Sequence, residues 1–117
     1  MISGIDASLS ALQAYGKRLQ NNGNNVANMN TEGFKKGRVL LSEAQPQGVR
    51  AHHEKINTPG PRVLEETGDG HRMIEQSNVD LGEEIPEMMV NQHAFLANIK
   101  SLQASDEMTK SLLDIKA

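Results

Sequence analysis

The 117-residue sequence predicts a mainly α-helical fold, in which N- and C-terminal helices form a coiled-coil-like helical hairpin or bundle around a short irregular or β-hairpin middle region. Apolar residues recur at helical spacing at both ends of the chain, whereas the residues between them are rich in Gly and Pro. The aromatic residues are few: Tyr15, Phe34 and Phe95. Because large aromatic side chains usually dominate core energetics, we expect a thin, aliphatic core.

We divide this single structural domain into three regions: an N-terminal helix over residues 1–31, a short turn-rich region over 32–77 and a long C-terminal helix over 78–117. The first helix has an a/d heptad pattern, which is typical of a narrow seam against another helix. Its large apolar members are Ile5, Leu9, Leu12, Leu19 and Val26. Gly16 and Gly23 fall on the same pattern and allow either close approach of a neighbouring backbone or a hinge.

Asn makes up six of the ten residues from 21 to 30. Asn is a poor helix former, because its amide competes for the hydrogen bonds of the backbone, and each Gly costs about 1 kcal/mol relative to Ala. We therefore expect the second half of the first helix to fray unless tertiary contacts support it.

The middle region contains the turn sequences QPQG, NTPGPR and TGDGH, separated by short apolar stretches. Pro59 and Pro61 flank Gly60, which argues against a central strand there. Short strands and an irregular loop both fit this pattern, and we expect at most one small hairpin.

The last region has the strongest helical periodicity. Its apolar seam contains Ile85, Met88, Phe95, Ile99 and Leu102, and Gln92 interrupts it. After Leu102 the seam shifts by a three-residue step to Ser105, and it continues through Met108, Leu112 and Ile115. Asp80 and Glu83 resemble a capping box. Pro86 requires that the helix begin within one turn before it. The helix then has about 30 residues, or roughly 45 Å at 1.5 Å per residue.

We find no residue pattern typical of a catalytic, metal-binding or cofactor-binding site, and we do not expect an enzyme. Cys is absent, and the adjacent His52 and His53 point apart in either regular structure. The acidic pairs lack a partner for acid–base chemistry and are expected to be solvated: Glu65–Glu66, Glu83–Glu84 and Asp106–Glu107.

The charge and hydropathy of the chain restrict its partners. A net charge of −3 and a pI of about 5.8 do not suggest nucleic-acid binding. No stretch approaches the roughly 20 apolar residues of a membrane-spanning helix. The N-terminus has neither a basic segment nor a continuous apolar run, so we expect no cleaved signal peptide.

Two segments resemble a known family. NNVANMNTEGFKK, with Asn28, Thr31, Gly33 and Phe34, resembles the N-terminal signature of flagellar basal-body rod and hook proteins. The segment from Ser77 to the C-terminus, which begins SNVDLGEE, is similar to their C-terminal signature and includes Asn78 and Asp80.

The resemblance implies a structural subunit of the bacterial flagellar basal-body rod. Family members are axial proteins whose terminal helices pack together and with neighbouring subunits. The resemblance implies partners among copies of the chain, other rod proteins and the flagellar export apparatus, and a location in the periplasmic rod. The short middle region favours the small proximal-rod type. The alternative is a helical interaction module, an adaptor or chaperone that binds a partner helix.

The residues of the signature turn also have physical roles. Gly33 suits a backbone with positive φ. Asn28 and Thr31 can bond backbone groups left open at the helix end, and Phe34 is expected to pack against the apolar seam.

Overall fold

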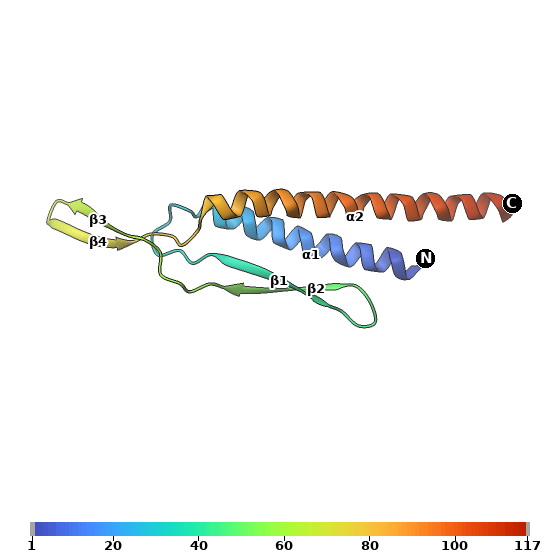
Figure 1. Ribbon diagram of the computed structural model, residues 1–117, viewed down its shortest axis with the longest axis horizontal. Coiled ribbons are helices and arrows are strands. Elements are labelled where there is room, and N and C mark those ends of the chain that lie inside the picture. The colour runs from blue at the N-terminus through green and yellow to red at the C-terminus, as the bar shows by residue number, and fades with distance from the viewer. Residues whose placement is uncertain (1, 117) are drawn as a thin grey trace.

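The computed structural model describes residues 2–116 and shows two helices and two β-hairpins in an elongated molecule (Figure 1). The elements in chain order are α1 (Ile2–Ala27), β1 (Gly37–Glu43), β2 (Val49–Lys55), β3 (Arg62–Thr67), β4 (Gly70–Glu75) and α2 (Leu81–Lys116). This arrangement confirms the predicted fold class. Met1 and Ala117, the outer limits of the predicted first and last regions, lie outside the described residues.

The molecule is a rod rather than a globule. Its extents are 81 × 24 × 18 Å and its radius of gyration is 20.8 Å. A compact domain of about 100 residues has a radius of gyration of about 13 Å. A chain of this shape leaves much of its surface in contact with solvent or with other molecules.

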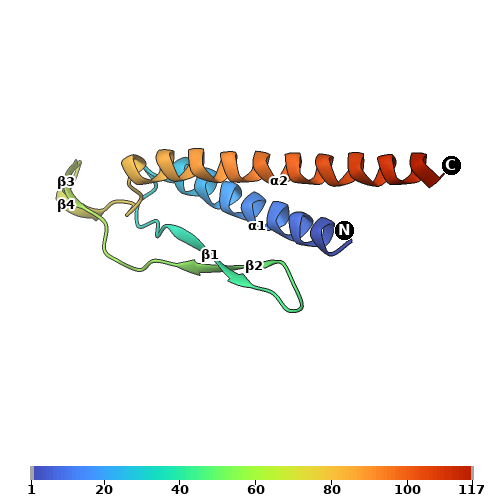
Figure 2. The same ribbon diagram turned by 45° about the vertical axis from the view of Figure 1, so that its right-hand side comes forward.

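The two helices pack antiparallel, and the β1–β2 hairpin covers the side of α1 that faces away from α2 (Figures 1 and 2). Gly16 of α1 lies opposite Phe95 of α2, where an added Cβ would be 3.9 Å from the Phe95 ring. With 36 residues, α2 exceeds α1, which has 26. At 1.5 Å per residue α2 is about 15 Å longer, and its C-terminal end extends beyond α1.

The middle region forms two separate antiparallel hairpins, so the expectation of at most one small hairpin was wrong. Gly37 pairs with Lys55 and Glu43 with Val49 in the first, and Arg62 pairs with Glu75 in the second. The turn sequences QPQG and TGDG each close one hairpin. Pro59 and Pro61 lie in the connection between the hairpins, as their restriction against central strands predicted.

The interior is even poorer in large apolar side chains than predicted. The buried apolar residues among those whose burial is described, 4–116, are Ala11, Ala14 and Val39. The largest side chains that are fully buried are instead Asn22, Asn25 and Asn91. Among the described residues, fourteen large apolar side chains are exposed, nine of them on α2. The fold therefore depends on polar contacts and leaves most of its apolar surface uncovered.

The start of α2 differs from its prediction. Asp80 caps the helix, and its Oδ1 accepts a hydrogen bond from the Gly82 N–H at 2.9 Å. Glu83 lies next to Lys36, 3.1 Å from its Nζ. Pro86 is the sixth helical residue, beyond the first turn, and the helix has 36 residues rather than about 30. Proline removes one hydrogen bond, to the Gly82 carbonyl, and the helix accommodates this loss after a capped first turn.

Because the core is thin, we predict that helicity depends on association. Far-UV circular dichroism over a wide dilution series will show a helical signal that rises with protein concentration, since neighbouring copies cover apolar faces that one chain leaves open. A full helical signal that is constant down to dilute monomer would contradict this prediction.

Candidate functional site

The contact between α1 and α2 contains a buried polar cluster, which we define as Asn22, Asn25, Glu84 and Asn91. The Asn22 Nδ2 donates to Glu84 Oε2 at 2.8 Å, and the Asn25 Nδ2 donates to Glu84 Oε1 at 3.2 Å. The Asn91 Nδ2 donates to Asn22 Oδ1 at 2.8 Å. The Glu84 residue is 4% exposed. The cluster thus joins residues from the two ends of the chain.

The Glu84 carboxylate determines the orientation of the amides around it. An ionised carboxylate only accepts hydrogen bonds, so Asn22 and Asn25 must both present their NH₂ groups to it. The Asn22 oxygen then faces Asn91, which must present its own NH₂ group. Hydrogen bonds to an ionised acceptor are stronger than those between neutral groups. The cluster therefore selects one register of α1 against α2.

Asn25 also connects α1 to the first strand. Its Oδ1 accepts from the Gly37 N–H at 2.9 Å, and its Nδ2 donates to the Gly37 carbonyl at 3.0 Å. The Asn21 Nδ2 donates to the same carbonyl at 2.9 Å. An added Cβ on Gly37 would lie 2.4 Å from Asn21 Oδ1 and 2.7 Å from His53 Nε2. A Cβ at Gly37 would therefore displace the Asn21 and His53 side chains.

The polar cluster overturns one prediction and changes the meaning of another. Glu84 was expected to be solvated, but it is buried because Asn22 and Asn25 satisfy both of its oxygens. The Asn residues weaken α1 as an isolated helix, yet in the folded chain they supply its tertiary contacts. The missed signal was the alternation of polar and apolar residues at heptad positions of α2, where Glu84, Met88, Asn91 and Phe95 follow 4-3-4 spacing.

Asn78 joins three segments of the chain at the base of the helix pair. Its Oδ1 accepts from the Lys36 N–H at 2.7 Å, and its Nδ2 donates to the Ile56 carbonyl at 2.8 Å and the Thr58 carbonyl at 3.0 Å. Its own N–H donates to the Phe34 carbonyl at 3.3 Å. The N-terminal and C-terminal signature segments therefore meet at Asn78.

Glu75 forms a second junction beside it. Its carboxylate accepts from the Lys35 Nζ and from the Gly60 N–H, the latter at 3.0 Å, and its carbonyl accepts from the Gly33 N–H at 2.9 Å. The Lys35 hydrogen bond, followed by the Gly60 N–H, lowers the pKa of Glu75 below its ordinary value of 4.5. An added Cβ on Gly60 would lie 1.9 Å from the Gln76 carbonyl oxygen, so only glycine fits.

The signature turn has the predicted backbone geometry. Gly33 has a φ of +70°. The Asn28 Nδ2 donates to the Asn24 carbonyl at 2.9 Å, and the Thr31 Oγ1 donates to Asn28 Oδ1 at 3.1 Å. Phe34 is half-buried, and its packing against the apolar seam stays a prediction.

The residues predicted to pack or assemble fall into two groups. Half-buried are Ile5, Leu12, Leu19, Val26, Met88, Phe95, Ile99 and Leu102. Exposed are Leu9, Met108, Leu112 and Ile115. Their role in assembly stays a prediction in both groups.

The seam of α2 departs from the predicted one at two positions. Ile85 is 41% exposed, and Gln92 is also exposed, because Glu84 and Asn91 turn inward in their place. Ile85 instead joins an outer row, which we define as Leu81, Ile85, Met89 and Leu96. Residues four apart share one face of a helix, and the four side chains of this face of α2 are exposed.

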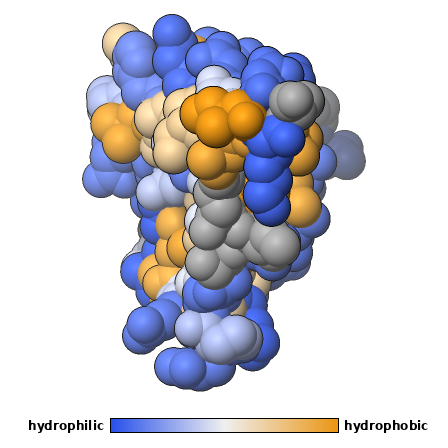
Figure 3. Space-filling view, turned by 90° about the vertical axis from the view of Figure 1, so that its right-hand side faces the viewer, coloured by the Kyte–Doolittle hydropathy of each residue, from blue (hydrophilic) through white to orange (hydrophobic). Residues whose placement is uncertain are grey.

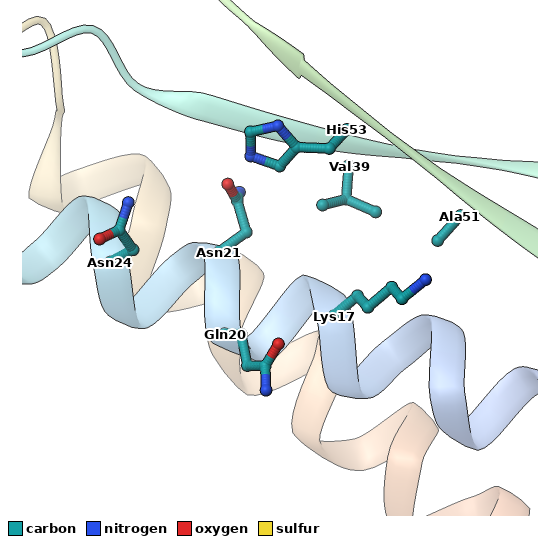
Figure 4. A pocket seen from close by; sticks show the side chains of 7 residues that line it. All are labelled: Lys17, Gln20, Asn21, Asn24, Val39, Ala51 and His53. Carbon is teal, nitrogen blue, oxygen red and sulfur yellow. The ribbon is translucent and has the colours of Figure 1, made fainter.

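A groove of about 370 Å³ lies between α1 and the β1–β2 hairpin (Figure 4). Its lining residues are Lys17, Gln20, Asn21, Asn24, Val39, Ala51 and His53. Asn21 points toward His53, whereas Gln20 points away from the hairpin (Figure 4). This set contains no carboxylate or hydroxyl nucleophile for the histidine to activate.

The described part of the chain holds no group of three His, Cys, Asp or Glu side chains arranged to bind a metal ion. None of its helices is long and apolar enough to cross a membrane. The features described above are the polar cluster, the junctions at Asn78 and Glu75, and the exposed outer row of α2.

Comparison with known proteins agrees with the position of the two signature segments. Residues 5–35 match the family model of flagella basal body rod proteins, and residues 71–115 match that of the flagellar basal body rod FlgEFG protein C-terminal region. Together the two matches span about two thirds of the chain.

A curated relative is similar over part of its length. The chain is 33% identical over 75 residues to flagellar basal-body rod protein FlgG of Bacillus subtilis (strain 168). This match covers 59% of the chain and 28% of the relative. The chain therefore covers less than a third of that protein.

We predict that the polar cluster holds the helices together. Glu84→Ala leaves the buried Asn22 Nδ2 without its acceptor and removes one of the two acceptors of Asn25 Nδ2, and it will lower the free energy of unfolding by about 2–4 kcal/mol. Glu84→Gln keeps one acceptor oxygen and will have a smaller effect. Urea denaturation at a fixed protein concentration measures both. The control is Glu83→Ala at the exposed neighbour, which will cost at most about 1 kcal/mol; equal losses in Glu83→Ala and Glu84→Ala would disprove the role of the cluster.

The second prediction concerns Glu75 and pH. Since the folded pKa lies below the ordinary one, the contribution of Glu75 to stability is present above pH 4.5 and is lost as the pH falls through the lowered folded pKa. A ¹³C NMR titration of the Glu75 carboxyl will give a midpoint below 4.5. In Lys35→Met the midpoint will move up toward the ordinary value, whereas Lys55→Met will leave it in place. An unchanged midpoint in Lys35→Met would contradict this assignment.

Proposed function

The chain belongs to the flagellar basal-body rod protein family, and from that membership we propose that it is a structural subunit of the bacterial flagellar rod that self-assembles through its terminal helices into the axial drive shaft. One observation supports the proposal most strongly: the helix pair is held by a polar cluster, while nine large apolar side chains of α2 remain exposed. Contiguous exposed apolar surface is typical of a protein–protein interface.

The helix pair offers more than one surface for neighbours. The outer row of α2 is one, with Ile85 41% and Met89 56% exposed. An apolar groove of about 400 Å³ between the helices is another, lined by Leu12 of α1 with Ile99 and Leu102 of α2. A subunit of a continuous tube must contact neighbours on several sides at once, and this distribution of apolar surface fits that requirement better than a module with one binding groove.

We also infer the setting of the protein from the family. Its partners are copies of itself and other rod proteins, and its location is the periplasmic rod, which it reaches through the flagellar export apparatus. The short middle region favours a proximal-rod type. The proposal includes no catalytic activity, since the family is structural.

We predict that a charge in the groove between the helices prevents rod assembly. Leu12→Asp or Leu102→Asp, expressed in a strain that lacks the wild-type gene, will abolish swimming and leave no complete rods in electron micrographs of basal bodies, because a buried carboxylate without a partner is strongly unfavourable. Gln13→Asp and Ser101→Asp place the same charge at exposed neighbouring positions and will retain motility.

Export of each variant is measured in the same strains, so that a secretion defect is separated from an assembly defect. Normal rods built from either leucine variant would contradict the proposed function.

A further inference from the structure

The β3–β4 hairpin is an unpartnered apolar element at one end of the molecule. Among residues 2–116 it packs against no helix and no other strand. Leu64 and Met73 lie opposite each other across the two strands and are 58% and 59% exposed. An isolated two-stranded hairpin is at best marginally stable in water, so this pair of side chains indicates a surface that is covered in the assembled state.

Apolar side chains near the C-terminal end of α2 form a second exposed surface. Gly16 lies opposite Phe95 in the antiparallel pair, and α1 begins at Ile2. The N-terminal end of α1 therefore lies beside about residue 109 of α2, and the rest of α2 extends beyond it. On this end Ala104, Glu107, Met108, Ser111 and Leu112 line a shallow hollow of about 490 Å³. Met108 is 56% and Leu112 54% exposed, and the end view shows apolar side chains around this tip (Figure 3).

The two surfaces complement each other in size and charge. The small side chains Ala104 and Ser111 leave room beside Met108 and Leu112 for two inserted apolar side chains. Arg62 lies two residues before Leu64 and so projects from the same face of the hairpin. Among the described residues neither Arg62 nor Glu107, which lines the hollow, forms an ion pair, although Arg62 lies close enough to Glu75, and Glu107 to Lys110, to interact with it electrostatically.

The position of the surfaces determines the kind of contact. They lie at opposite ends of the 81 Å long axis (Figures 1 and 2), so one chain cannot bring them together. A contact between different surfaces of two identical chains leaves one of each surface free, so it can repeat from copy to copy, and it forms an open filament wherever the rotation does not close a ring. In a row of identical chains, one type of contact covers the hairpin surface of one copy and the hollow of the next.

We propose that the Leu64–Met73 face of the hairpin binds the hollow at the end of α2 in a second copy of the chain, with Arg62 beside Glu107. This head-to-tail contact rests on the proposed rod function and specifies which surfaces join successive subunits along the axis. It is separate from the lateral contacts of the outer row.

A mixing experiment tests the contact with full-length protein. Leu64→Lys/Met73→Lys removes the hairpin surface, and Met108→Lys/Leu112→Lys removes the hollow. All four positions are exposed, and in dilute solution circular dichroism will give the same helical signal for each variant as for the parent monomer. In sedimentation velocity each variant alone will remain monomeric at concentrations at which the parent chain forms a series of oligomers. An equimolar mixture will form dimers and nothing larger, because each dimer has one intact contact and two blocked ends.

Two outcomes would overturn the proposal. If the hollow variant still dimerises by itself, the hairpin contacts another hairpin; if both variants associate like the parent, these ends are not the axial contact. Neither result contradicts the proposed rod function, because a separate experiment tests that function: the swimming and basal-body phenotype of the Leu12 and Leu102 variants.

A charge exchange gives an independent test. Arg62→Glu and Glu107→Arg will each weaken self-association about tenfold or more, because like charges then face each other across the contact. The double variant will recover most of the loss. The control is the charge exchange Arg38→Glu with Asp106→Arg. These two residues lie outside the two surfaces and form ion pairs within the chain, so the double variant will not show mutual rescue. Lack of rescue in the Arg62/Glu107 pair would disprove their contact.

Discussion

The architecture depends on one buried carboxylate. Glu84 lies between the helices without an ion pair among the described residues, and its two oxygens are satisfied by amide groups of Asn22 and Asn25 from the other end of the chain. A buried acceptor without partners is costly, so this carboxylate and these amides must come together or remain in water. That requirement sets the register of α2 on α1, and through the bonds of Asn25 to Gly37 it also sets the position of the β1–β2 hairpin.

Polar contacts of this kind specify an arrangement more than they stabilise it. Buried polar groups at seam positions of coiled coils are known to select register at a cost in stability. Here the buried apolar side chains are small, Ala11, Ala14 and Val39 among the described residues. A helix pair held in this way keeps one geometry while its large apolar side chains stay on the outside, where neighbouring subunits can bury them. Specificity within the chain and stability from assembly are thus supplied by different residues.

The junctions at Asn78 and Glu75 explain why the two signature segments occur together. Asn78 bonds backbone groups at Phe34, Lys36, Ile56 and Thr58, so it requires both ends of the helix pair and the connection between the hairpins. Glu75 similarly joins Lys35, Gly60 and Gly33. Single polar side chains thus join the base of the helices to both hairpins. Most of these bonds are made to backbone groups, which every residue type presents, and their partners therefore left no pattern in the sequence.

The sequence by itself determined the two terminal helices, the turns between the strands, the cap at Asp80 and the positive φ at Gly33, because these follow from local periodicity and from the backbone preferences of single residues. It did not reveal which face of α2 turns inward. Periodicity favoured the apolar Ile85, yet Glu84 is the buried residue, because its partners lie about sixty positions away and only the folded chain brings them to it. The burial of a polar group is decided by its partner, and the partner is a property of the tertiary structure.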